Sequence, residues 1–191
     1  RRVHRAAGRG DGGEVLSRLD QLWAGWRQAY VAALGDGVGP GGPGTAVPDG
    51  STLFEAIEQS GLDDSETFIV HRGATCFALL NAYPYTSGHL MVLPRRAVST
   101  LAGLTDREHD ELWATVRDAV AAVGSAFSAG GVNVGLNLGA AAGAGVPGHL
   151  HVHVVPRWAG DTNFTTTTAD LRVLPEALGD SWRRLCEAWP T

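Results

Sequence analysis

Residues 149–155 (HLHVHVV) place three histidines at alternate positions, separated by apolar residues and followed by valines. Successive side chains of a β-strand point to opposite faces of a sheet. A strand over this segment therefore has all three imidazoles on one face and its leucine and valines in a core on the other. Three titratable rings in a row reduce hydrophobic burial on that face of the strand. The pattern therefore indicates chemistry rather than packing.

Three interpretations of the histidine run compete. The rings could be structural, each held by hydrogen bonds. They could bind a metal, but His149 and His153 lie roughly 13 Å apart at the backbone of a straight strand, and Zn–N bonds are about 2.1 Å long. One ion would then need a further carboxylate or thiolate ligand, and no such cluster flanks the run. We favour nucleophilic catalysis at phosphorus, because neutral imidazole is a good nucleophile near pH 7 and also a usable acid.

The segment before the histidines is rich in glycine and alanine, and residues 139–148 read GAAAGAGVPG. Glycine lets backbone N–H groups approach an anion closely, so a loop containing Gly143 and Gly145 can bind phosphate without a lysine. A plain flexible loop has the same composition. Its direct connection to three histidines favours the phosphate site.

The basic residues of the 191-residue chain are fifteen arginines and no lysine. This composition excludes a Walker A loop and Schiff-base or pyridoxal chemistry, which all use lysine. A net charge of −5 argues against general nucleic-acid binding. No apolar run approaches the ~18 residues of a membrane span. Two cysteines form no disulfide framework and no CxxC motif, which fits a cytoplasmic protein.

The chain divides into an N-terminal arm, residues 1–50, and a compact domain, residues 51–191. The arm is predicted to contain a mobile tail, an amphipathic helix over residues 14–33 and a Gly/Pro-rich linker over residues 35–50. Glycine and proline occupy ten of the sixteen linker positions.

The compact domain is predicted to be α+β, with a mostly antiparallel sheet of five strands and two main helices segregated to one side. Thr105 and Glu108 form a capping box for the first of these helices, and Gly130-Gly131 is expected to end it. The second helix is expected over about 175–188. The predicted strands are 67–71, 75–81, 89–94, 132–138 and 149–155, and a turn at Arg72-Gly73-Ala74 joins the first two.

The histidine run with its preceding Gly148 resembles the signature of the histidine triad (HIT) superfamily of nucleotide hydrolases and transferases. Further segments, and the helix around Leu22-Trp23, are similar to the actinobacterial branch described as diadenosine tetraphosphate phosphorylases. These further segments are LNAYPY (80–85), GHLMVLP (88–94), NVGLN (133–137) and PRWAGDTNF (156–164). The resemblance implies a HIT-like fold.

The resemblance also implies roles for the three histidines. His151, in the middle, matches the nucleophile that forms a nucleotidyl-histidine at the α-phosphorus. His153 matches the residue that contacts the phosphate and the bridging oxygen of the leaving group. His149 matches the buried supporting member.

Five other positions match the family pattern. Asn81 matches the residue that holds the ribose hydroxyls, and His89 matches a ring that supports the triad. Asn137 matches a phosphate contact, while Gly145 and Val146 match loop positions that approach the phosphate. The alternative from the residues alone is that both asparagines only satisfy nearby backbone groups, Asn81 in the turn that follows it.

The residues after the last predicted strand give a further expectation. Arg157 can pair with phosphate and Trp158 can stack on a base, so we expect Trp158 to line the nucleotide site. Alternatively, Arg157, Trp158 and Asp161 only end the strand and close the surface.

The chain departs from the family pattern at two places. Many relatives have a Ser or Thr hydroxyl in the glycine-rich loop where Gly145 and Val146 stand, so phosphate contact here relies on backbone N–H groups. Many members of the branch also carry a zinc-binding cysteine pair before the first strand. Ser51-Thr52-Leu53-Phe54 contains no cysteine, and we predict no structural zinc.

The resemblance as a whole implies a cytoplasmic enzyme that converts diadenosine tetraphosphate and inorganic phosphate to ATP and ADP. It implies no metal in the covalent step, while allowing Mg²⁺ to accompany a polyphosphate substrate, and assembly into a homodimer or homotetramer. Partners of nucleic-acid or membrane type are not expected. The alternatives are a HIT hydrolase or transferase acting on a nucleoside phosphoramidate, adenylyl sulfate or an unusual nucleotide, and a non-catalytic nucleotide-binding protein.

Overall fold

A computed structural model describes residues 47–161 and 176–191. Its centre is an antiparallel five-stranded sheet with the strand order β1-β2-β3-β5-β4. The strands are β1 (Ile69–Arg72), β2 (Cys76–Leu80), β3 (Leu90–Pro94), β4 (Gly131–Leu136) and β5 (Val152–Arg157). Together with the helices described below, this arrangement confirms the predicted α+β class.

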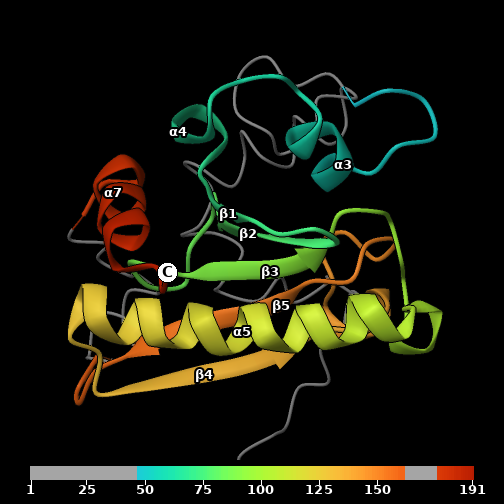
Figure 1. Ribbon diagram of the computed structural model, residues 1–191. Helices are drawn as coiled ribbons and strands as arrows, with labels where there is room; N and C mark the ends of the chain where they lie inside the picture. The colour runs from blue at the N-terminus through green and yellow to red at the C-terminus, as the bar shows by residue number, and fades with distance from the viewer. Residues whose placement is uncertain (1–46, 162–175) are drawn as a thin grey trace, which may run out of the picture.

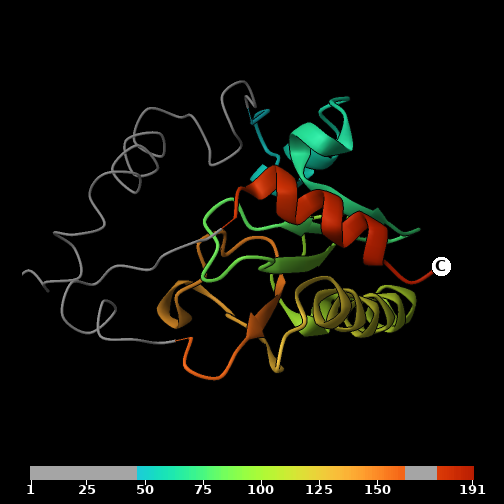
Figure 2. The same cartoon turned by 90° about the vertical axis from the view of Figure 1, so that its left-hand side faces the viewer.

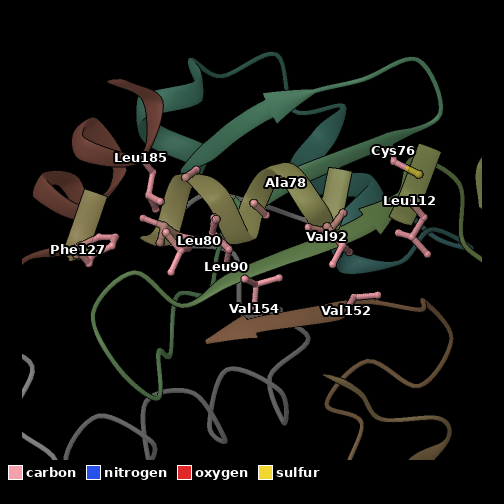
Figure 3. Packing of buried hydrophobic residues seen from close by; sticks show 14 of the residues in the cluster. Cys76, Ala78, Leu80, Leu90, Val92, Leu112, Phe127, Val152, Val154 and Leu185 are labelled. Carbon is pink, nitrogen blue, oxygen red and sulfur yellow. The ribbon is translucent and has the colours of Figure 1, made fainter. Parts of the chain in front are cut away.

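One face of the sheet is covered by two helices, α5 (Asp106–Phe127) and α7 (Leu178–Ala188) (Figures 1 and 2). Alternate residues of β2, β3 and β5 point toward α5 (Figure 3), and Leu185 of α7 joins them. The members from the sheet are Cys76, Ala78, Leu80, Leu90, Val92, Val152 and Val154. Burial of this strip favours the observed register of the strands, because a shift of one residue would turn these side chains away from the helices.

Local sequence determines where α5 begins and ends. The Thr105 hydroxyl accepts from Glu108 N–H, and the Glu108 carboxylate accepts from Thr105 N–H, which confirms the predicted capping box. The helix ends earlier than Gly130-Gly131, because Ser128 at its C-cap is already left-handed, with φ of 48°.

The opposite face of the sheet carries a second hydrophobic cluster beneath the short helix α3 (Leu53–Glu58). Phe54 and Ile57 of α3 pack with the remaining alternate residues of the central strands, Phe77, Leu79, Met91 and Leu93. The histidine run lies on this face, since its intervening Leu150 and Val152 are in the α5 core. Another short helix, α4 (Asp64–Thr67), leads into β1.

Several boundaries differ from the prediction. Arg72 is still part of β1, so the turn to β2 begins at Gly73. Strand β5 begins at Val152, because His149 and Leu150 bond to Val146 and Val98 instead of pairing with β3. The predicted helix over 14–33 and most of the linker lie outside the described residues. In the part of the chain that the structure describes, no helix has both the length and the apolar character to cross a membrane.

Candidate active site

His149 is fully buried and is bonded at both ring nitrogens. Its Nε2 lies 2.8 Å from the Pro94 carbonyl oxygen, and its Nδ1 lies 2.7 Å from Thr52 Oγ1. A carbonyl oxygen only accepts, so Nε2 carries the proton, and Nδ1 of the neutral ring accepts from the Thr52 hydroxyl. Burial is the largest influence on this ring and lowers its pKa, although the bond to Pro94 and the charge of Glu55 act in the opposite direction.

His151 is oriented by the backbone of His149. Its Nδ1 donates to the His149 carbonyl oxygen at 2.8 Å. In the neutral ring the free lone pair is therefore on Nε2. The residue is 5 % exposed, and its ring packs against Phe54, with ring centroids 5.3 Å apart. The central histidine is thus held in the tautomer that a nucleophilic Nε2 requires.

His153 is oriented by His89, which directly precedes β3. His89 Nδ1 accepts from Tyr85 N–H at 3.1 Å, so its proton is on Nε2, which lies 3.0 Å from His153 Nδ1. The neutral His153 ring therefore carries its own proton on Nε2. Burial and then the nearby His153 and His151 charges lower the pKa of His89 to about 3, and burial followed by His151 lowers the pKa of His153 to about 4.

The rings form one continuous group on the α3 face of the sheet. His151 and His153 meet edge to face at 5.0 Å, and His89 lies 5.1 Å from His153. The ring of Tyr85, a residue that is 45 % exposed, packs against His89 with ring centroids 4.6 Å apart. His151 Nε2 therefore offers a lone pair, and the neighbouring His153 offers its Nε2–H as a hydrogen-bond donor.

Asn81 lies beside this group at the end of β2. Its Oδ1 accepts from Tyr83 N–H at 2.9 Å, and its Nδ2 is 3.5 Å from His89 Nδ1. The structure thus shows the turn contact that the sequence suggested as one role. It also places Asn81 beside the ring that orients His153, so its amide can support the site from that position.

Open space lies beside His153 on the neighbouring strand. Gly135 is its register partner on β4, and partners in an antiparallel pair share a face. A Cβ built on Gly135 would have no atom within 4 Å. The lack of a side chain here leaves room for a substrate next to the histidine rings.

The predicted phosphate contacts lie at the end of β4 and in the loop that follows. Asn137 comes directly after Leu136, the last residue of β4, whose register partner is Val152. In the loop, Gly143 is exposed and left-handed with φ of 88°, and Gly145 is exposed. Val146 instead packs against the α3-side hydrophobic cluster.

The prediction for Trp158 is wrong in its placement. Trp158 packs against the α5 core, and its indole Nε1 donates to the Phe127 carbonyl oxygen at 3.2 Å. Alternation along β5 explains this, since Trp158 shares the face of Val154 and not that of His153. Arg157 is held by a bidentate ion pair with Asp161 and a bond to Asn133, so these residues close the strand end.

The donor atoms of the described residues do not form a metal site. Within 47–161 and 176–191, no group of three or more His, Cys, Asp or Glu side chains is arranged to hold a metal ion. The ring nitrogens of His149 and the Nδ1 atoms of His151 and His153 already have partners within the protein. The absence of a structural zinc remains a prediction.

Comparison with known proteins agrees with this geometry. The HIT domain matches residues 63–160. An AP-4-A phosphorylase of Mycobacterium tuberculosis is 40% identical over 178 residues, which cover 90% of this chain and 85% of the relative. The chain belongs to the HIT family.

Two other HIT proteins show how broad the similarity is. The asymmetrical bis(5'-nucleosyl)-tetraphosphatase of Schizosaccharomyces pombe is 38% identical over 93 residues, about half of each chain. The crystal structure of a zinc-bound histidine triad family protein from Mycobacterium smegmatis is 27% identical, with a TM-score of 0.58, and the match covers 72% of this chain and 92% of that one. Of these relatives, one is named a phosphorylase and another a tetraphosphatase.

Several residues that contact the histidines of this HIT protein were not predicted from the sequence. Thr52 and Phe54 contact the triad from α3, and Tyr85 lies over His89. A signal for the first was present, since TLFE (52–55) is a capping-box sequence. No local signal shows that the helix it starts packs on histidines nearly a hundred residues away.

Proposed function

We propose that this protein is a diadenosine tetraphosphate phosphorylase, which uses His151 to transfer an adenylyl group from the dinucleotide to inorganic phosphate. The observation that carries the proposal is the bond from His151 Nδ1 to the His149 carbonyl oxygen, which leaves the Nε2 lone pair free. The 40% identity to the Mycobacterium tuberculosis AP-4-A phosphorylase over most of both chains supports the substrate and the acceptor.

In the first step, His151 Nε2 attacks an α-phosphorus of the bound dinucleotide. A P–N bond forms, and the bond from this phosphorus to the bridging oxygen breaks, so ATP leaves with the electron pair. His153 Nε2–H donates a hydrogen bond to the bridging oxygen and stabilises its developing negative charge. A polyphosphate is a good leaving group, so His153 acts as a donor without having to become charged first.

In the second step, an oxygen of inorganic phosphate attacks the same phosphorus of the adenylyl-histidine. The P–N bond breaks, the lone pair returns to His151 Nε2, and ADP is released. Splitting the transfer in this way replaces one direct displacement by two easier ones. The acceptor determines the product, because water in place of phosphate would give AMP.

The test is product analysis with diadenosine tetraphosphate in the presence and absence of phosphate. We expect equal amounts of ATP and ADP with phosphate, and little turnover without it. Release of AMP and ATP independently of phosphate would indicate a hydrolase, as the tetraphosphatase relative is named. Tight nucleotide binding with no turnover in either condition would indicate a non-catalytic binding protein.

A further inference from the structure

Helix α3 reaches the site through the side chain of its N-cap residue. Thr52 Oγ1 lies 2.7 Å from His149 Nδ1, although the two residues are 97 positions apart. The same hydroxyl accepts from Glu55 N–H at 3.4 Å, as in an ordinary capping box. One hydroxyl therefore serves both the start of a helix and a buried histidine.

Glu55 fixes the position of Thr52. Its Oε2 accepts from Thr52 N–H at 2.9 Å and is 3.1 Å from Thr52 Oγ1, while its Oε1 accepts from Ala97 N–H at 2.8 Å. The two backbone bonds attach the start of α3 to the segment that follows β3. The same carboxylate therefore aligns Thr52 with His149.

The hydroxyl has one proton and two neighbouring acceptors. Nε2 of His149 donates to Pro94, so Nδ1 of the neutral ring needs a donor, and Thr52 Oγ1 supplies it at the shorter of its two distances. A buried acceptor left without a donor costs free energy. The His149 ring is therefore held at both nitrogens, by Thr52 on one side and Pro94 on the other.

The carbonyl of His149 then transmits this position to His151. That carbonyl oxygen accepts from His151 Nδ1, and Phe54, two residues after Thr52, packs against both rings at 5.4 and 5.3 Å. If the loss of the Thr52 bond displaces the whole His149 residue, and not only its ring, the carbonyl acceptor that fixes the His151 tautomer moves with it.

We propose that Thr52, supported by Glu55, is a positioning residue for the nucleophile, acting through the His149 ring and its carbonyl on His151. This inference rests on the proposed function only in calling His151 the nucleophile. The effect of Thr52 on the His151 tautomer does not require a substrate. It adds α3, which lies outside the matched HIT domain, to the machinery of the site.

The chain offers a matched control in Thr105. Thr105 caps α5 with the same Thr-x-x-Glu arrangement, its hydroxyl accepting from Glu108 N–H and lying 3.0 Å from the Glu108 carboxylate. Within the described residues, the side-chain hydroxyl of Thr105 bonds only to Glu108 and to no histidine. Thr52→Val and Thr105→Val therefore remove the same kind of cap, but only the first removes a donor from the triad.

The experiment measures the His151 tautomer by ¹⁵N–¹H NMR of the full-length, ligand-free protein, with the signal assigned by its loss in His151→Asn. We expect the Nδ1–H tautomer in wild type, Thr52→Ser and Thr105→Val, and a mixture of tautomers in Thr52→Val. With diadenosine tetraphosphate and phosphate, we expect kcat of Thr52→Val to fall on the order of 10-fold with little change in KM, and Thr52→Ser to restore it.

An unchanged His151 tautomer in Thr52→Val would overturn the proposal, as would an equal loss of kcat in Thr52→Val and Thr105→Val. Thr52→Ala, which also lacks the hydroxyl, takes the place of the valine variant if that one does not fold. An inactive wild type with the expected NMR result would instead refute the proposed function while leaving the positioning effect intact.

Discussion

Nε2 of His89 lies 3.0 Å from Nδ1 of His153, and the two residues are 64 positions apart. Antiparallel pairing of β3 with β5 produces this contact, since Met91 is the register partner of His153 and His89 precedes it by two residues on the same face. The contact determines which nitrogen of His153 keeps a proton. It thereby supplies the hydrogen-bond donor that the leaving group requires.

We expect His89→Leu to lower kcat on the order of 10- to 100-fold, because His153 Nδ1 then has no donor and its tautomer is no longer fixed. His89→Gln keeps an N–H group at this position and should recover part of the loss. Steady-state kinetics with diadenosine tetraphosphate checks both variants. Equal activities of His89→Leu and wild type would show that His153 needs no support.

Acid should destabilise the fold through the same pair of rings. Unfolded histidines take up protons below about pH 6.5, whereas His153 and His89 in the folded protein stay neutral down to pKa values of about 4 and about 3. The unfolded state then binds more protons, so stability is complete above pH 6.5 and falls as the pH decreases toward 4.

Urea unfolding at pH 7.5 and pH 5 measures this effect. For His89 alone the expected loss over this interval is on the order of 2 kcal/mol. His89→Leu should be less stable than wild type at pH 7.5 but should lose less between the two pH values. An equal loss in both proteins would contradict the buried, neutral state of His89.

Gly135 provides a test of where the substrate lies. Gly135→Val fills the open space beside His153, and we expect KM for diadenosine tetraphosphate to rise about tenfold while the unfolding midpoint stays near that of wild type. Gly131→Val is the control. It lies on the same strand, where an added Cβ also has no atom within 4 Å, but its partner is Arg157. If both variants bind substrate like wild type, the nucleotide does not occupy the space beside His153.

Periodicity predicted the sheet well because burial on the α5 side repeats every second residue. Leu150 and Val152 identify one face of the sheet, and His151 and His153 then belong to the other. The strand order β1-β2-β3-β5-β4 was not predicted from the sequence. The capping box of α5 follows from a local pattern as well. The start of β5 at Val152 does not, because the bonds of His149 and Leu150 to distant loops decide it.

The site itself was predictable only for residues within or beside the histidine run. Trp158 was misplaced because its aromatic ring suggested stacking on a base, whereas its position at the end of β5 puts it against α5. Thr52 and Tyr85 were missed because their roles come from tertiary packing, which brings α3 and the segment after β2 onto the triad. Local sequence patterns do not predict such tertiary contacts.

The most direct test of the central claim is to detect the covalent intermediate on His151. The protein is mixed with diadenosine tetraphosphate without phosphate, quenched in alkali, where a histidine P–N bond is stable, and mapped by peptide mass spectrometry. We expect an adenylyl group on the peptide containing His151, its disappearance with release of ADP when phosphate is added, and neither adduct nor turnover in His151→Asn, which still binds nucleotide. Full turnover by His151→Asn, or an adenylyl group on another residue, would contradict the account.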